Sequence, residues 1–474
     1  MISRVFDSES HARFIELSRD RNPIHTDPVA ARRTQAGAPI VFGIHSLLCL
    51  LEECVAEQGA QLPEPTSLKA QFRKPIYLGD AAEMEASRAT AEALRARIRV
   101  DDTEVVTASV GFTQKQSSVP SIGSISGPMI SPGEVPRDLR IEEMEGLSGC
   151  LSFAGSLEQI RATFPRAAGY FGASQIGALV CCSCVVGMIV PGLHSLFAAL
   201  DISFVRGAER SDTLHFAVTW VEPRFRRVRI GIHGGGLRGV LETMVRPPPV
   251  SQPTTKSVAA LVRKDEFRGS TALIVGGSRG LGELTAKLIA AGGGRVIITY
   301  ATGKVDAQAV AEEINNAGGE CASIPYDVRA PAADQLSPLC ARAPTHAYYF
   351  ATPAIGRRKA LPFDLRRFND FNDFYVTAFL DLVRACLQLR PEGVKVFYPS
   401  TVFVETRPDD MTEYAMSKAA AELLCADMPK YLPGAQVVLR RLPRLLTDQT
   451  SALLNSSALD PMDVLLPIVR EMHA

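Results

Sequence analysis

Hydrophobic residues are spaced in three different ways along the chain. Apolar and polar residues alternate from Ala81 to Thr113 and again from Leu214 to Val245, the period of strands that bury one face. Two other stretches, about Val41 to Ala56 and Ile176 to Val190, are largely apolar and predict long buried helices. From about residue 267 the order becomes apolar strand, glycine-rich turn and helix, which predicts a parallel sheet.

Two stretches rich in proline, glycine and small polar residues divide the chain into three blocks. The first runs from Ser117 to Pro136, and the second comprises prolines 247–249 with Ser251 to Lys256. We therefore expect domains at residues 1–116, 140–246 and 265–474. The first two blocks each contain one long helix and several antiparallel strands, so we interpret them as two copies of one α+β fold. The third is an α/β domain.

Composition narrows the classes of function. The 51 basic and 51 acidic residues cancel, which argues against a binder of nucleic acid or of an anionic membrane surface. The run from Ile176 to Val190 is shorter than the roughly 20 residues of a spanning helix, so no membrane insertion is expected. Met1 to Arg21 is too polar for a secretory signal, and the ten cysteines lack zinc-ligand spacing. We expect a cytoplasmic protein with reduced thiols and no metal site.

A carboxylate and an imidazole flank an Asn-Pro turn near the start of the chain. Asp20 and His25 lie five positions apart, and Pro23 interrupts any regular helix between them, so both can face one cleft. Gly43 then opens the first long helix, where backbone N–H groups can hold a carbonyl oxygen that gains negative charge. Alone, such a pair is equally consistent with a capping carboxylate and a solvated histidine.

The segment Phe14 to Pro28, with Gly43 and the turn at Gly79-Asp80, resembles the MaoC-like family of (R)-specific enoyl-CoA hydratases over roughly residues 10–113. The resemblance implies a hot-dog fold and catalytic roles for Asp20, His25 and the Gly43 amide. The implied reaction adds water to, or removes it from, the C2–C3 bond of an acyl thioester. The implied substrates are carried by CoA or by an acyl carrier protein, and the hydroxyacyl form is (R)-3-hydroxyacyl.

Two positions depart from this family's pattern. Arg19 stands where a glycine is usual, and Phe42 stands where a histidine is usual, although His45 lies nearby. The middle block has no counterpart of the Asp-His motif, and we interpret Gly192 as a turn residue and His194 as a loop residue. We expect this block to be a degenerate second hot-dog that covers the sheet edge of the first and helps to form the acyl tunnel.

The third block contains two motifs that belong to nucleotide-dependent chemistry. Thr271 to Gly282 predicts a strand, a glycine turn and a helix start, where backbone can approach a pyrophosphate. Tyr414 and Lys418 share one face of a later helix. The ammonium there can lower the pKa of the phenol, which then exchanges a proton with a substrate carbonyl.

Together these motifs resemble the short-chain dehydrogenase/reductase family over about residues 267–450. The resemblance implies a Rossmann fold, a catalytic Tyr414 and Lys418, and a catalytic hydroxyl that is either Ser400 or Thr401. The residues implied to bind the cofactor are Gly276, Ser278, Arg279, Gly280, Leu281, Gly282, Tyr300, Asp327, Val328, Ala351, Lys418 and Pro443.

The end of the second predicted strand indicates which nicotinamide cofactor is bound. Arg295 to Tyr300 ends without an acidic residue, which in NAD-dependent enzymes would bind the ribose 2′-hydroxyl. With Arg279 in the glycine turn, this favours NADPH over NADH. Arg279 is equally consistent with a solvated loop charge.

The two resemblances share one intermediate, the (R)-3-hydroxyacyl thioester. We therefore expect a bifunctional enzyme that reduces a 3-oxoacyl thioester with NADPH and dehydrates the product. Because both families self-associate, we also expect a homo-oligomer. Departures at Val275, at residues 350–353 and at Tyr375 leave a second hypothesis open, in which the reductase block is a degenerate nucleotide-binding domain or a scaffold.

Overall fold

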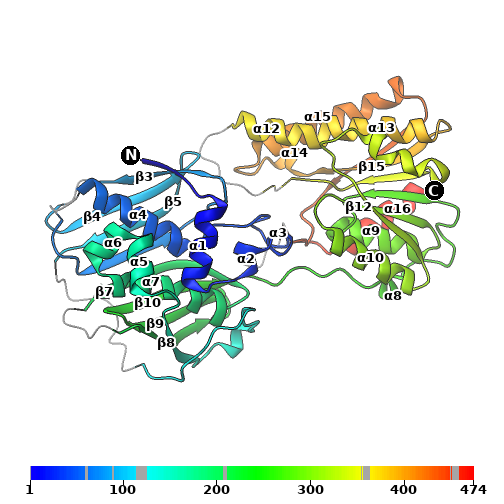
Figure 1. The fold of residues 1–474 in the computed structure, drawn as a ribbon. Coiled ribbons are helices and arrows are strands. Elements are labelled where there is room, and N and C mark those ends of the chain that lie inside the picture. Colours follow the sequence, from blue (N-terminus) through cyan, green and yellow to red (C-terminus); the bar gives the residue numbers. More distant parts are fainter. Residues whose placement is uncertain are drawn as a thin grey trace. The chain divides into compact units, whose positions relative to one another are not determined.

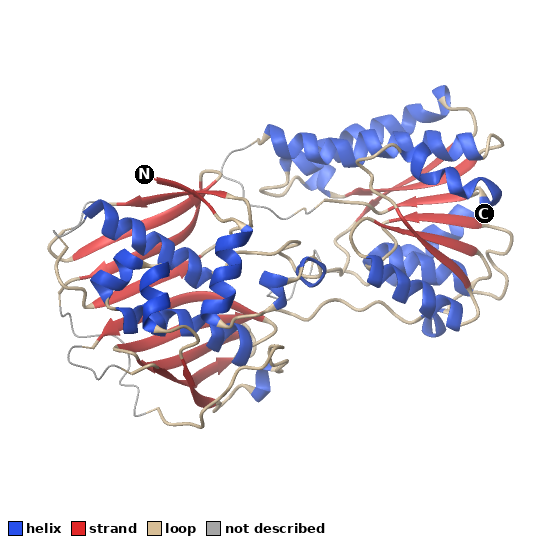
Figure 2. Cartoon of the chain, viewed as in Figure 1, coloured by secondary structure: helices blue, strands red, loops and turns tan. Residues whose placement is uncertain are grey.

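The computed structural model describes residues 2–58, 62–87, 90–113, 125–205, 211–353, 355, 363–448, 450 and 458–474. The chain forms two compact units, and the division falls between Pro248 and Pro249. Each unit has a sheet of its own (Figures 1 and 2). Each also has its own hydrophobic core. The predicted boundaries at residues 116 and 140 remain predictions, because residues 114–124 lie outside the described part of the chain.

The N-terminal unit contains one antiparallel sheet of ten strands in the order β1-β3-β4-β5-β2-β7-β10-β9-β8-β6. The strands are β1 Ile2–Val5, β2 Ser67–Phe72, β3 Ala81–Ala86, β4 Ala93–Val100, β5 Thr103–Gly111, β6 Ser148–Ser152, β7 Ser195–Phe204, β8 Thr213–Glu222, β9 Arg227–Gly234 and β10 Leu237–Val245. The alternation read from the sequence is present in β4, where Leu94 and Ile98 are buried and Arg95 and Arg97 are exposed. The antiparallel hot-dog prediction is confirmed.

Two long helices lie on one face of this sheet (Figure 1). They are α4, Gly43–Gln58, and α7, Ala173–Cys184, which continues into the π-helical turn η3, Val185–Ile189. The shorter helices are α1 Ser8–Ser18, α2 Pro23–Thr26, α3 Pro28–Ala31, η2 Ile141–Glu143, α5 Leu157–Thr163 and α6 Pro165–Phe171. Among the described helices none is by itself long and apolar enough to cross a bilayer; α6 and α7 reach that length only as a pair bent by 114°.

The two halves of the sheet repeat each other in topology. The first half has the order β1-β3-β4-β5-β2, with α4 between β1 and β2 in sequence. The second half has the corresponding order β6-β8-β9-β10-β7, with α7 between β6 and β7. The halves join where β2 pairs with β7, from Ser67 opposite Ser203 to Gln71 opposite Ala199. This pairing covers a strand edge that each half would otherwise expose.

Part of the first predicted linker belongs to the sheet. Met129 forms a parallel bridge with Cys150, and the N–H of Ile130 donates to the Cys150 carbonyl at 2.8 Å. At Gly127 a Cβ atom would lie 2.6 Å from the Gly149 nitrogen, so only glycine fits there. The small residues that suggested a free linker therefore allow a close backbone approach along β6.

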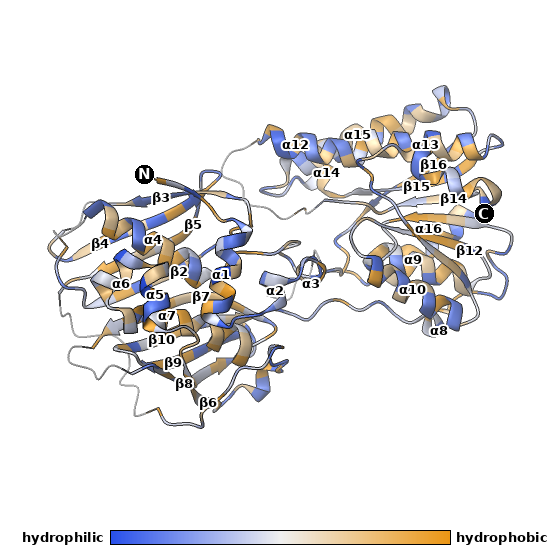
Figure 3. Cartoon of the chain, viewed as in Figure 1, coloured by the Kyte–Doolittle hydropathy of each residue, from blue (hydrophilic) through white to orange (hydrophobic). Residues whose placement is uncertain are grey.

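The C-terminal unit contains a parallel sheet of six strands in the order β13-β12-β11-β14-β15-β16. The strands are β11 Thr271–Val275, β12 Arg295–Tyr300, β13 Glu320–Pro325, β14 His346–Tyr349, β15 Val394–Thr401 and β16 Ala435–Leu442. The inner strands are largely apolar (Figure 3), and β11 buries four consecutive residues because helices cover both faces. This strand order confirms the Rossmann prediction.

The helices of this unit cover the two faces of the sheet. They are α8 Thr255–Val258, α9 Gly280–Ala291, α10 Lys304–Asn316, α11 Ala332–Leu336, η4 Ser337–Arg342, α12 Leu365–Asn372, η5 Asp373–Thr377, α13 Ala378–Leu389, α14 Phe403–Thr406, α15 Thr412–Tyr431 and α16 Pro461–His473. The second predicted linker runs into α8, where the Thr255 N–H donates to Glu313 at 2.7 Å. The compact unit thus begins before residue 265.

Candidate active sites

Asp20 lies directly after helix α1 and is 2% exposed. Arg19, which replaces the usual glycine, caps α1 with φ 57°, a left-handed conformation that glycine adopts more easily. The Asp20 carboxylate accepts hydrogen bonds from the Ser183 hydroxyl at 2.7 Å and from the Asn22 N–H at 3.1 Å. Burial raises the pKa of Asp20 to about 7, although these two bonds oppose the rise.

His25 is partly buried in helix α2, which Asn22 caps through its side chain. Its Nδ1 lies 2.7 Å from the Ile40 carbonyl oxygen. Because a carbonyl only accepts hydrogen bonds, the proton is on Nδ1 and the Nε2 lone pair is available as an acceptor. Burial lowers the pKa of His25 to about 3, so the imidazole is neutral at physiological pH.

Aromatic rings surround this imidazole. The ring of Phe42, the second departure from the family pattern, has its centroid 4.0 Å from that of His25. His11 is 3.0 Å from the His25 carbonyl oxygen and stacks on Phe42. His45 instead stacks on Phe14 at 4.8 Å in the core, where burial lowers its pKa to about 3. His45 therefore has a packing role, and Phe42 is the neighbour of the site.

Gly43 is the first residue of α4, so the helix's own hydrogen bonds leave its N–H unused. A Cβ atom here would lie 3.1 Å from the ring of Phe72. The position thus favours glycine, and the role of its N–H as a donor to a thioester carbonyl stays a prediction.

The second half of the sheet contributes residues that the sequence did not identify. Ser183 and Gly187 lie on successive turns of α7 and η3, and both contact Asp20. The Asn22 side-chain nitrogen donates to the carbonyls of Gly187 at 2.9 Å and Gly192 at 3.0 Å. The Asp-His site is therefore built from both halves.

The loop after η3 is held by a buried arginine. Arg246 donates to the Leu193 carbonyl at 2.6 Å, and its charge also contributes to the lowered pKa of His25. His194 lies 3.2 Å from Asp138, in keeping with its predicted role as a loop residue. Sequence reasoning missed Arg246, because an arginine at the end of a strand gives no sign of burial.

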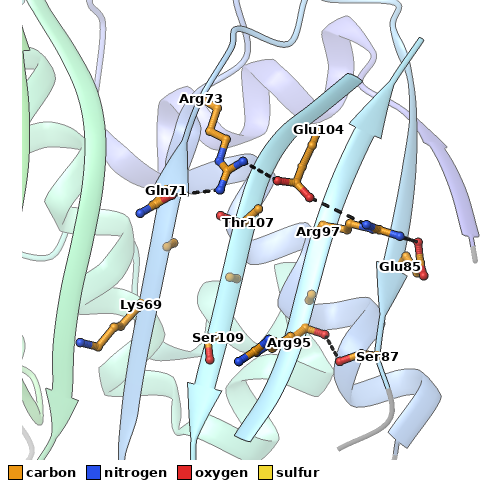
Figure 4. A pocket seen from close by; sticks show the side chains of 13 residues that line it. Lys69, Gln71, Arg73, Glu85, Ser87, Arg95, Arg97, Glu104, Thr107 and Ser109 are labelled. Carbon is orange, nitrogen blue, oxygen red and sulfur yellow. Dashed lines mark hydrogen bonds and ion pairs between the residues drawn. The ribbon is translucent and has the colours of Figure 1, made fainter. Parts of the chain in front are cut away.

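A separate pocket of about 610 Å³ lies on the other face of the sheet, over β2 to β5 (Figure 4). Four of its charged side chains pair with each other, Arg73 with Glu104 at 2.7 Å and Arg97 with Glu85 at 2.9 Å. Its lining includes neither Asp20 nor His25. The hollow is therefore not part of the Asp-His site.

The residues predicted to bind a cofactor follow the carboxyl ends of the parallel strands. Gly276 follows β11, Asp327 and Val328 follow β13, Ala351 follows β14 and Pro443 follows β16, while Tyr300 ends β12. Carboxyl ends of parallel strands meet at one edge of the sheet, where doubly wound folds bind ligands. The structure therefore brings the set to one edge, at the point where the strand order reverses between β11 and β14.

The glycine turn has the form that a dinucleotide pyrophosphate requires. Gly276 and Gly280 adopt φ 82° and 58°, and a Cβ on Gly282 would lie 2.3 Å from the Gly276 carbonyl oxygen. Helix α9 begins at Gly280, so its first N–H groups face the turn that contains Ser278 and leads into Leu281. These residues fit a nicotinamide dinucleotide.

Arg279 is paired rather than solvated. Its guanidinium lies 3.2 Å from Asp448, and the two side chains are 24% and 9% exposed. Asp448 also accepts a hydrogen bond from the Val250 N–H at 2.7 Å. A 2′-phosphate at Arg279 would therefore meet a competing carboxylate.

The structure distinguishes the two hydroxyls left open by the sequence. Thr401 is the side chain that opposes the rise which burial causes in the pKa of Tyr414, whereas the Ser400 hydroxyl donates to Glu422 at 2.5 Å. Burial nevertheless raises the pKa of Tyr414 to about 12. Thr401 is the hydroxyl placed beside the phenol.

The side chain of Lys418 is buried among aromatic rings. Its ammonium donates to the Pro399 carbonyl at 2.7 Å and lies 4.0 Å from the centroid of Tyr375. Burial lowers the pKa of Lys418 to about 7. We expected this ammonium to lower the pKa of Tyr414, but burial of the phenol dominates and raises it.

Two departures from the reductase pattern meet beside Lys418. The hydroxyl of Tyr375, which stands where the family has an asparagine, lies 2.5 Å from the Thr352 hydroxyl. Thr352 belongs to the altered segment after β14. The two substituted positions thus contact each other through their hydroxyl groups, beside the Lys418 ammonium.

Both units correspond to known families. Fold and site together define a double hot-dog unit with an acid–imidazole pair and a Rossmann unit with a Tyr-Lys pair. Residues 2–110 match the family described as MaoC like domain, and residues 270–439 match the family described as short chain dehydrogenase. The chain thus contains a MaoC-like domain at its N-terminus and a short-chain dehydrogenase domain at its C-terminus.

Individual relatives match one domain at a time. A fatty acyl-CoA reductase of Acinetobacter baylyi is 31% identical over 175 residues, which are 35% of this chain and 58% of that protein. An (R)-specific enoyl-CoA hydratase of Aeromonas caviae is 35% identical over 88 residues, 18% of this chain and 63% of that protein. The chain therefore spans less than two thirds of either relative.

Among solved structures, a short chain dehydrogenase from Burkholderia cenocepacia J2315 in complex with NADP is similar to this chain at 24% identity. The match covers 44% of this chain and 91% of that one, with a TM-score of 0.39.

Proposed function

We propose that the chain is a bifunctional enzyme that acts on acyl thioesters. Its C-terminal unit reduces a 3-oxoacyl thioester, and its N-terminal unit interconverts the (R)-3-hydroxyacyl and trans-2-enoyl forms. Two relatives support a thioester substrate, because one is named a fatty acyl-CoA reductase and the other an (R)-specific enoyl-CoA hydratase. The substrate is carried by CoA or by an acyl carrier protein.

The protonation states of Asp20 and His25 carry the hydratase proposal. The neutral imidazole offers Nε2 as a base, and the carboxyl, with a pKa of about 7, is protonated in about half of the molecules at neutral pH. In dehydration Nε2 takes the proton from C2, and the Asp20 carboxyl gives its proton to the C3 hydroxyl, which leaves as water. The Gly43 N–H stabilises the negative charge on the thioester oxygen. Hydration is the reverse.

In the reductase unit, a bound NADPH would supply the hydride. The glycine turn and the start of α9 would hold its pyrophosphate, and Arg279, which is paired with Asp448, is the cation of the glycine turn that would be available to a 2′-phosphate. Tyr414 gives its proton to the substrate carbonyl, Thr401 orients the phenol, and Lys418 supplies positive charge behind it.

The test supplies a 3-oxoacyl-CoA and NADPH to the full chain and analyses the acyl products by mass spectrometry. We expect the hydroxyacyl and enoyl products in succession. Asp20→Asn combined with His25→Ala should abolish the enoyl product alone, and Tyr414→Phe should abolish NADPH oxidation alone. Dehydration that survives the first variant contradicts the N-terminal assignment.

A second function for the C-terminal unit is supported by the contact between Tyr375 and Thr352. The Tyr375 ring lies against the Lys418 ammonium, at a position where the reductase pattern has an asparagine, and this change favours a domain that binds a nucleotide without turnover. Calorimetric titration with NADPH separates the two functions. Binding with oxidation supports the reductase, binding without oxidation supports a sensor or scaffold, and no binding supports a packing role.

The same proposal includes a homo-oligomer in the cytoplasm. Ten free cysteines, nine of them buried, support a reducing compartment. Analytical ultracentrifugation of the full chain measures the oligomeric state, and a monomer would contradict the proposed association.

A further inference from the structure

The second hot-dog half contains no Asp-His motif, yet its central helix lies directly against the acid of the first half. Asp20 and Ser183 are 163 positions apart in the chain, and their side chains are 2.7 Å apart. Both belong to the same compact unit and both are buried, at 2% and 4% exposure. An isolated serine in an apolar helix is otherwise costly to bury, so this contact requires an explanation.

The next turn of the same helix leaves space for the carboxyl. A Cβ atom on Gly187 would lie 2.2 Å from one carboxylate oxygen of Asp20 and 2.4 Å from the other. Any larger residue would displace the acid. The Gly187 carbonyl also accepts a hydrogen bond from Asn22 at 2.9 Å, which fixes the turn that bears His25.

We infer that Ser183 and Gly187 are positioning residues for the Asp20 acid, so that the second hot-dog half supplies one wall of the hydratase site of the first. Ser183 fixes the orientation of the carboxyl by donating to one oxygen. Gly187 admits the carboxyl against the helix backbone. This inference rests on the proposed hydratase function.

The groups around Asp20 predict the direction in which its pKa changes when the Ser183 hydroxyl is removed. The hydroxyl of Ser183 stabilises the ionised carboxylate, so its removal raises the pKa of Asp20 further above 7. The titratable neighbour on α7 is the Cys184 thiol, whose pKa burial raises, so it stays protonated. Two arginines flank Asp20 in sequence. The Arg19 backbone carbonyl accepts a hydrogen bond from the Cys184 thiol, and the Arg21 guanidinium pairs with Glu16 and Glu134.

The test measures hydration of a trans-2-enoyl-CoA by the full chain as a function of pH. We expect Ser183→Ala to lower kcat about tenfold or more, with a smaller change in KM. The loss of rate at alkaline pH should begin at a higher pH than in the wild-type chain. Ser183→Thr should restore both. Ser174→Ala is the control, because Ser174 lies on the same helix and donates to the Ser211 carbonyl.

Gly187 is tested with its own control. Gly187→Ala should lower kcat strongly, whereas Gly169→Ala should not, because a Cβ at that helical glycine meets nothing within 4 Å. Circular dichroism on each variant shows whether the fold is retained. A folded Gly187→Ala chain with wild-type kcat would overturn the assignment of Gly187.

A second measurement does not need a substrate. Carboxyl ¹³C NMR of the aspartate-labelled full chain, with Asp20→Asn for assignment, reports the pKa of Asp20 directly. We expect a higher value in Ser183→Ala. An unchanged value, together with unchanged kcat and pH profile, would overturn the inference about Ser183 even if the wild-type chain is an active hydratase. If the wild-type chain hydrates no enoyl thioester, the proposed function fails, and the NMR shift still decides the inference.

Discussion

The side-chain nitrogen of Asn22 donates a hydrogen bond to the carbonyl oxygen of Gly192 at 3.0 Å, across 170 positions of sequence. The same nitrogen bonds the Gly187 carbonyl, while the Asn22 backbone contacts both Asp20 and His25. The buried residue Asn22 thus connects the Asp20 carboxylate and the backbone of His25 to the second half of the sheet.

Removal of this amide should damage both stability and activity. Asn22→Ala leaves two buried carbonyls without their donor and removes the cap of α2, so we expect a loss of about 2–4 kcal/mol in the free energy of unfolding. Hydratase activity should fall with it. Urea denaturation of the full chain, followed through the N-terminal unit, measures the loss.

Asp27→Ala is the matched control. Asp27 caps α3 through exposed hydrogen bonds to Val29 and Ala30, so it should cost only about 1 kcal/mol. Equal losses in the two variants would show that the bonds across the halves contribute little.

The pH dependence of the hydratase follows from two opposite shifts. Burial raises the pKa of Asp20 to about 7 and lowers that of His25 to about 3, so the protonated acid and the neutral base coexist between these values. We expect kcat/KM to fall about tenfold for each pH unit above 7, because the carboxyl then loses its proton. Initial rates across pH 5 to 9 test this expectation, and a rate that still rises above pH 8 would contradict it.

The ion pair between Arg279 and Asp448 predicts that substitution of either residue changes the preference for NADPH over NADH. Asp448→Asn frees the guanidinium for a 2′-phosphate, so we expect Kd for NADPH to fall about fivefold while Kd for NADH stays the same. Arg279→Ala should abolish the difference between the cofactors. Calorimetry or fluorescence titration measures both constants.

Glu320→Gln provides the control for this prediction. Glu320 pairs with Arg295 at 2.9 Å at the amino ends of β13 and β12, the edge of the sheet away from the glycine turn. The variant should leave both dissociation constants unchanged. If it changes them as much as Asp448→Asn does, the effect is one of net charge alone.

The two adjacent hydroxyls at the end of β15 should differ in importance. Thr401→Ala removes the partner of the Tyr414 phenol and should lower the rate of carbonyl reduction about 100-fold or more. Ser400→Ala breaks a bond to Glu422, which keeps its partner Arg441, so the loss should be much smaller. NADPH oxidation with a 3-oxoacyl-CoA measures both rates. The reverse order would assign the catalytic role to Ser400.

Much of the fold could be read from the sequence because local patterns determine it. The alternation in β4 reflects a sheet with one solvent face, and the apolar run of β11 reflects burial on both faces. The glycine turn before α9 could be placed because its backbone conformation excludes other residues. Asp20 and His25 could be singled out because Pro23 marks the turn between them.

The rest of the site depends on contacts between distant segments, which leave no local signal. Ser183 looks like a chance polar residue in an apolar helix, and Gly187 looks like a packing glycine. The pairing of Arg279 with Asp448 likewise spans 169 positions. The pKa of Tyr414 could not be inferred from the spacing of Tyr and Lys, because burial of the phenol raises it and depends on distant packing.

The central pairing of β2 with β7 joins two halves that have the same strand order but different sequences. In a dimer of identical subunits, every substitution at such an interface appears twice, once on each side. Here the copies are encoded separately in one chain, so one can keep the reactive groups while the other changes to support them.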